Sequence, residues 1–93
     1  MPYIDQGQRD RLDPAIHLLD LAIRRAQGRS LGQVGALNYA ITRLLLGNLL
    51  EEPSYMQIAA AVGMLETCKL ELYRKLAAPY EDDKAKTNGE VYP

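Results

Sequence analysis

The sequence predicts an all-α fold, a small bundle of three main helices followed by a short C-terminal helical turn. The chain has 93 residues, which is enough for one small domain over residues 1–93. Its apolar residues are dominated by 15 Leu and 11 Ala, both strong helix formers, against only three Val. These apolar residues recur every three or four positions between helix start and stop signals, which is the pattern of helices packed on one face.

The first main helix is expected over residues 14–27. Asp13 is a good N-cap residue, and Pro14 suits the first helical position, where its missing N–H costs nothing. Residues 5–11 can add one further helical turn, capped by Asp5.

The second helix, expected over residues 33–50, is apolar around nearly its whole circumference. Arg43 is the only charged residue between Arg29 and Glu51. Apolar side chains occupy both sides of this helix: Val34, Leu37, Ile41, Leu44, Leu45, Leu46, Leu49 and Leu50. A helix of this kind needs burial on more than one side. We therefore expect a second copy of the chain to cover it, so that the protein is a homo-oligomer, with a dimer favoured.

Three glycines fall inside expected helices, where each costs roughly 1 kcal/mol relative to Ala. They are Gly35, Gly47 and Gly63. Close approach of another helix is the favoured explanation, ahead of contact with a ligand.

The third helix is expected over residues 55–77. Ser54 and Gln57 form a capping-box pattern at its start. Pro79 disfavours helical geometry at the preceding residue, so the helix should stop or kink there. A short helical turn is expected over residues 80–86, followed by a tail over residues 89–93.

Composition excludes several classes of function. The formal net charge is −1, from 11 basic and 12 acidic residues, and offers no global attraction to nucleic acid or to an anionic membrane. No apolar stretch approaches the roughly 20 residues of a membrane span. Cys68 is the only cysteine, which excludes an intramolecular disulfide, and a cytoplasmic protein is expected. Arg24, Arg25 and Arg29 leave an accessory nucleic-acid binder as a second alternative function.

The residues that usually carry chemistry do not form a pattern here. His17 has no metal-binding partner one turn away, and Cys68 has no base near it in the sequence. Glu66 and Glu71 are five residues apart, so they do not share a helix face as a Mg²⁺-binding pair does. The acidic run at residues 81–83 is more typical of a solvated turn. We therefore predict no catalytic residues, no metal and no cofactor, and a role outside catalysis is favoured.

Four short motifs carry a resemblance to known proteins. They read Asn38-Tyr-x-Ile-Thr42, Glu71-x-Tyr-Arg74, Pro79-Tyr-Glu-Asp82-x-Lys84 and Asn88-Gly-x-Val-Tyr92. Together with the Met-Pro-Tyr-Ile start, they resemble the signature of a group of short uncharacterised proteins from bacteriophages and bacteria. Lys75 and Glu90 depart mildly from that pattern. The resemblance implies no known activity, but it suggests that one set of residues acts together: Asn38, Tyr39, Thr42, Glu71, Tyr73, Arg74, Tyr80, Glu81, Asp82, Lys84 and Asn88.

Two interpretations of this set stay open. It can be a structural clasp that holds the C-terminal segment on the second helix, since buried polar groups need partners. Alternatively it forms a small polar pocket for a small molecule, a nucleotide or a metal ion. The favoured function is a non-catalytic, homo-oligomeric interaction or structural protein, and a ligand-binding protein that uses this pocket is the first alternative.

Overall fold

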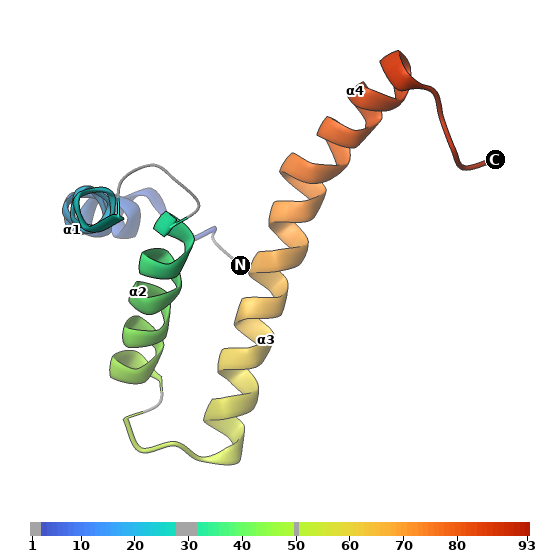
Figure 1. The fold of residues 1–93 in the computed structure, drawn as a ribbon. Coiled ribbons are helices and arrows are strands. Elements are labelled where there is room, and N and C mark those ends of the chain that lie inside the picture. Colours follow the sequence, from blue (N-terminus) through green and yellow to red (C-terminus); the bar gives the residue numbers. More distant parts are fainter. Residues whose placement is uncertain (1–2, 28–31, 50) are drawn as a thin grey trace. The chain divides into compact units, whose positions relative to one another are not determined.

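In the computed structural model, residues 3–27, 32–49 and 51–93 are described, and every regular element within them is helical. The elements are α1 (Gln6–Gln27), α2 (Gly32–Asn48), α3 (Tyr55–Leu72), the π-helical turn η1 (Tyr73–Ala77) and α4 (Ala78–Asn88) (Figure 1). The predicted all-α fold with three main helices is therefore confirmed. Arg29 and Leu50, which entered the predictions above, lie outside the described residues.

The chain divides between Ala61 and Val62 into two compact units. We call residues 2–61 the N-terminal unit and residues 62–93 the C-terminal unit, and each is described by itself. The single domain expected over the whole chain stays a prediction.

Helix α1 begins at Gln6, so the predicted start at residue 14 was wrong. A capping box at Asp5 explains the earlier start. The Gln8 N–H donates to Asp5 Oδ1 at 2.8 Å, and the Asp5 N–H donates to Gln8 Oε1 at 3.2 Å. Pro14 consequently lies inside the helix, where it removes one backbone hydrogen bond but leaves the helix intact.

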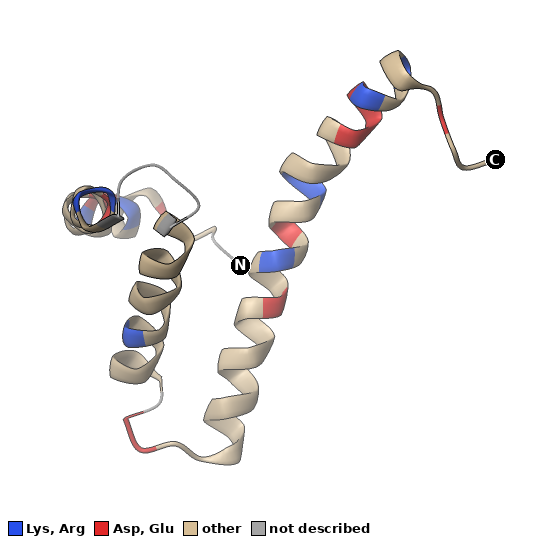
Figure 2. Cartoon of the chain, viewed as in Figure 1, with Lys and Arg blue, Asp and Glu red and all other residues tan. Residues whose placement is uncertain are grey.

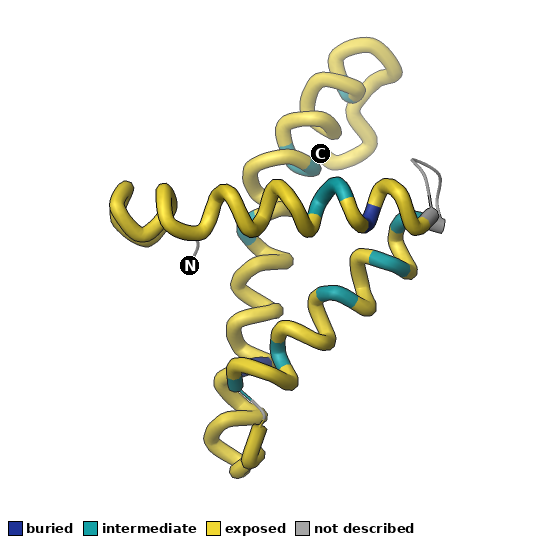
Figure 3. Tube along the Cα trace, turned by 90° about the vertical axis from the view of Figure 1, so that its left-hand side faces the viewer, coloured by how far each residue is buried: buried dark blue, intermediate teal, exposed yellow. Residues whose placement is uncertain are grey.

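In the N-terminal unit, α1 packs against α2, and the two helices approach each other near the C-terminal end of α1 and the N-terminal end of α2 (Figure 3). The two helices diverge toward their other ends (Figure 3). Ile23, which is 8% exposed, is the only large apolar side chain of the described residues that is buried, and Ala61 is buried as well. The side chains of Leu21, Leu45 and Leu49 are half-buried.

Every other large apolar side chain in the described ranges is exposed (Figure 3). On α2 these include residues on both sides of the helix: Val34, Leu37, Tyr39, Ile41, Leu44 and Leu46. The prediction that α2 has more apolar circumference than its neighbours cover concerns these side chains and stays a prediction. The sequence of α2 contains one charged residue, Arg43. Figure 2 accordingly shows this helix in tan over nearly its whole length.

At the start of α3 the predicted capping box is confirmed. The Gln57 N–H donates to Ser54 Oγ at 3.2 Å, and the Ser54 N–H donates to Gln57 Oε1 at 3.0 Å. These reciprocal bonds satisfy backbone donors that the first turn of a helix leaves without partners.

In the C-terminal unit, the end of α3, η1 and α4 follow one another without a break, so the predicted stop before Pro79 was wrong. The alternative of a kink at this point stays a prediction. Proline lacks an N–H and its ring clashes with the carbonyl four residues earlier in an α-helix. The π turn accommodates it, because the Ala78 N–H donates to the Tyr73 carbonyl, five residues back. Helix α4 then runs to Asn88, beyond the turn predicted at 80–86, and ends at Gly89, whose φ of 95° suits glycine.

None of the helices in the described ranges combines the length and the hydrophobicity that crossing a membrane requires.

Candidate functional site

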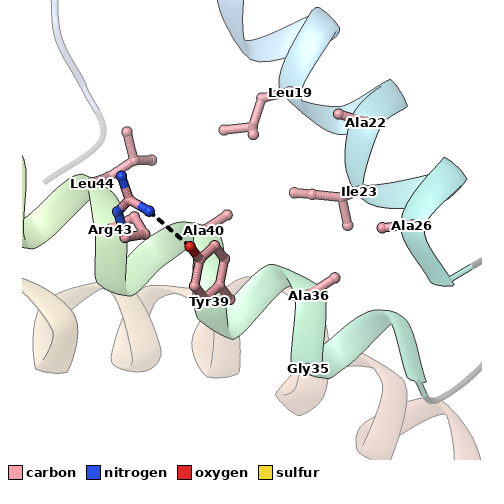
Figure 4. A pocket seen from close by; sticks show the side chains of 10 residues that line it. All are labelled: Leu19, Ala22, Ile23, Ala26, Gly35, Ala36, Tyr39, Ala40, Arg43 and Leu44. Carbon is pink, nitrogen blue, oxygen red and sulfur yellow. Dashed lines mark hydrogen bonds between the residues drawn. The ribbon is translucent and has the colours of Figure 1, made fainter.

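A groove of about 540 Å³ lies between α1 and α2, where the two helices begin to diverge (Figure 4). It is lined by Leu19, Ala22, Ile23 and Ala26 of α1, and by Gly35, Ala36, Tyr39, Ala40, Arg43 and Leu44 of α2. All but one of these residues are uncharged. The groove is therefore suited to apolar surface rather than to a highly charged ligand.

The sequence positions of the lining residues explain the groove. On each helix they recur three and four residues apart, so they share one face. Most of the residues where the helices approach are small, and Ala side chains fill little of the space between two backbones. Larger side chains, Leu19 on α1 and Leu44 on α2, stand where the helices are further apart (Figure 4).

One end of the groove is polar. Arg43 Nη1 donates to the Tyr39 hydroxyl at 2.7 Å, and the guanidinium carbon lies 5.7 Å from the centre of the Tyr39 ring (Figure 4). Both interactions join residues one helical turn apart. The guanidinium has further N–H groups, so this end of the groove can donate hydrogen bonds to a neutral acceptor or to an anionic group.

Of the three predicted site residues on α2, only Tyr39 lines the groove. The Thr42 hydroxyl donates to the Asn38 carbonyl at 2.9 Å, which is a local bond within the helix. The side chains of Asn38 and Thr42 are exposed on another side of α2.

The predicted site residues of the C-terminal unit form three local contacts. Arg74 and Glu71 make an ion pair at 2.9 Å, which their spacing of three residues along the helix allows. The other two contacts join the Tyr73 hydroxyl to Glu81 Oε2 at 3.3 Å, and the Lys84 ammonium to the Tyr80 ring at 5.6 Å from its centre.

The contact between Tyr73 and Glu81 depends on the π turn. Residues eight apart in an α-helix point in directions about 80° apart. A π turn contains about one residue more than an α turn, so Tyr73 and Glu81 come close to alignment two turns apart. The Glu81 carboxylate raises the pKa of the Tyr73 phenol above 10.0, because its negative charge repels the phenolate and because it accepts the phenol's hydrogen bond.

A second hollow, of about 300 Å³, lies where the residues after Gly89 run beside α4. It has a mixed polar lining that includes four of the predicted site residues: Glu81, Asp82, Lys84 and Asn88. Within the described residues, no group of three or more His, Cys, Asp or Glu side chains is placed to hold a metal ion.

The predicted set is thus divided. Its members on α2 belong to the N-terminal unit, and the remainder belong to the C-terminal unit. Within each unit the observed bonds are local. The clasp between the C-terminal segment and α2 stays a prediction.

Comparison with known proteins places the chain in a family. A family model described as "Domain of unknown function (DUF6899)" matches residues 1–91. The chain belongs to the DUF6899 family. No curated protein and no solved structure matches it significantly. The match covers nearly all of the four motifs described above, and the description of the family names no activity.

The sequence prediction for this DUF6899 chain missed most of the groove. Only Tyr39 was among the predicted site residues, and Arg43 and the lining residues of α1 were not. A signal for Arg43 was available, since it is the one charge on an apolar helix and follows Tyr39 by four residues. Another helix was expected to approach closely at Gly47 and Gly63. A Cβ added at either glycine would meet no atom within 4 Å, so the structure shows no such approach at these two positions.

Proposed function

We propose that this DUF6899 protein is a non-catalytic interaction protein that acts in the cytoplasm as a homo-oligomer, with a dimer favoured. One observation carries the proposal. Among the large apolar side chains of the described residues, Ile23 alone is buried, and α2 exposes apolar side chains on both sides. The resemblance to short bacteriophage and bacterial proteins is part of the same proposal.

The energetic argument concerns α2. Full burial of one Leu or Val side chain contributes about 1.5–3 kcal/mol, so covering several half-exposed side chains of α2 would contribute several kcal/mol per copy. The total stability of a small domain is only about 5–15 kcal/mol. A partner that covers α2 would therefore contribute a large share of the stability of this protein. A second copy is the simplest such partner, since closed two-fold dimers are the commonest assemblies.

The polar contacts support a role outside catalysis. Catalysis needs an acid, a base or a nucleophile positioned around one reacting atom. Here the groove contains a single charged side chain, Arg43, and the ion pairs Asp20–Arg24, Glu66–Lys69 and Glu71–Arg74 are local pairs along helix surfaces.

Sedimentation equilibrium over a micromolar concentration series tests the proposal. We expect a mass near twice the chain mass of 10.4 kDa that falls toward the monomer on dilution. A mass of one chain at every concentration would overturn it.

A ligand-binding function is the second candidate, and the mixed polar hollow beside Glu81, Asp82, Lys84 and Asn88 is the observation in its favour. A ligand that binds only the folded state raises the melting temperature. A thermal-shift screen of nucleotides and divalent ions would detect this. Absence of stabilisation with every compound would remove this candidate.

A further inference from the structure

We infer that the π turn η1 is a joint with two positions, and that the hydrogen bond between Tyr73 and Glu81 holds it in the π position. In the other position, which we call the α position, the same residues form a continuous α-helix. The Ala78 N–H then donates to the Arg74 carbonyl instead of the Tyr73 carbonyl. The inference concerns the C-terminal unit alone and goes beyond the proposed homo-oligomer.

Opposing penalties bring the two positions close in free energy. The π turn is a rare departure from α-helical hydrogen bonding. The α position has a penalty of its own, because the ring of Pro79 clashes with the carbonyl of Lys75, four residues earlier, and the missing N–H removes one hydrogen bond. A side-chain contact that forms in only one position can therefore decide between them.

The bond between Tyr73 and Glu81 is such a contact. The Tyr73 hydroxyl donates to Glu81 Oε2 at 3.3 Å, and in a continuous α-helix the two residues would point about 80° apart. Leu72 and Ala77, which precede η1 and α4, have no polar side chain with which to cap them. The bond is long and Tyr73 is exposed, so it can select between two positions of similar free energy but cannot impose an unfavourable one.

The position of the joint sets the direction in which α4 presents its charged residues. An α-helix turns by about 100° per residue, so loss of the one extra residue of the π turn rotates α4 by roughly this angle relative to the end of α3. The polar hollow that Glu81, Asp82 and Lys84 help to line turns with α4. A molecule that contacts both Tyr73 and this hollow can therefore do so in the π position only.

Scalar couplings across hydrogen bonds, measured by NMR in the full-length protein, identify the carbonyl to which the Ala78 N–H donates. Tyr73→Phe removes the hydroxyl and keeps the ring, and Glu81→Ala removes the acceptor. Each has a matched control. Tyr80→Phe removes a neighbouring phenol hydroxyl and keeps the ring that contacts Lys84. Glu81→Gln keeps a side-chain oxygen that can accept the hydrogen bond.

In the parent protein we expect the Ala78 nitrogen to couple to the Tyr73 carbonyl carbon. In Tyr73→Phe and Glu81→Ala this coupling should fall at least about twofold as the population shifts, and a coupling to the Arg74 carbonyl carbon should appear. The two controls, Tyr80→Phe and Glu81→Gln, should keep the parent pattern.

Three results would overturn the inference. An unchanged coupling in Tyr73→Phe or in Glu81→Ala would show that Pro79 alone fixes the turn. An equal loss of the coupling in either control would show that the turn does not depend on this hydrogen bond. A parent protein that couples only to the Arg74 carbonyl carbon would show that the α position is the stable one.

Discussion

The two units of this protein are built by different kinds of contact. In the N-terminal unit, α1 and α2 meet through residues that are far apart in the sequence, and Ile23 is buried where they approach. In the C-terminal unit, the bonds between side chains join residues three or eight positions apart along one helical run. The N-terminal unit thus presents a surface formed by two helices, whereas the side-chain bonds of the C-terminal unit lie along a single helical run.

This difference indicates which unit can gain most stability from association with a partner. An ion pair between exposed helix residues three or four apart contributes only about 0.2–0.5 kcal/mol. Burial of one Leu side chain contributes several times that amount. Covering the exposed apolar face of the N-terminal unit is therefore expected to matter more for stability than any local pair of the C-terminal unit.

The largest effect is expected at the buried anchor of the N-terminal unit. Ile23→Ala should lower the free energy of unfolding by about 2–4 kcal/mol, because it leaves a cavity where α1 meets α2. Ile16→Ala, on the same helix but exposed, is the matched control and should cost less than about 1 kcal/mol. Urea denaturation followed by circular dichroism measures both. Equal losses would show that the contact between α1 and α2 is not anchored at Ile23.

A smaller effect is expected at the π turn of the C-terminal unit. Pro79→Ala restores a backbone N–H and removes the ring, so we expect the turn to relax to α-helix and the free energy of unfolding to rise by about 1–2 kcal/mol. The relaxed helix should also take Tyr73 and Glu81 out of alignment. Denaturant unfolding and NOE contacts between residues five apart would report the two changes. A variant that keeps the π turn would show that Pro79 is not its cause.

The smallest effect is expected from the titration of Tyr73. Its pKa is raised in the folded protein, so the contribution of its bond to Glu81 is present below pH 10 and is lost as the pH rises through the raised pKa. Glu81→Gln removes the carboxylate and should return this pKa toward 10.0. A difference titration at 295 nm of parent and variant measures the shift. Superimposable curves would contradict the contact.

Several features of the fold could be predicted from the sequence because their causes lie within one helical turn. The capping box of Ser54 and Gln57, the ion pair of Glu71 and Arg74, and the apolar circumference of α2 all follow from residue types at spacings of three or four. The prolines were harder to interpret. A proline usually marks a helix boundary, but Pro14 and Pro79 both lie inside helical runs, because a cap further upstream and a π turn, respectively, allow the helix to continue.

The sequence by itself determined that this chain is helical, that α2 is apolar around most of its circumference, and that most of its charged residues lie on the other helices. Only the tertiary structure decided that α1 and α2 diverge from their contact at Ile23 and leave a groove with Arg43 and Tyr39 at one end. The physical reason is the distance along the sequence over which each kind of interaction acts. Helix propensity and capping act over three or four residues, whereas the groove depends on the distance between two helices, which the packing of distant side chains decides.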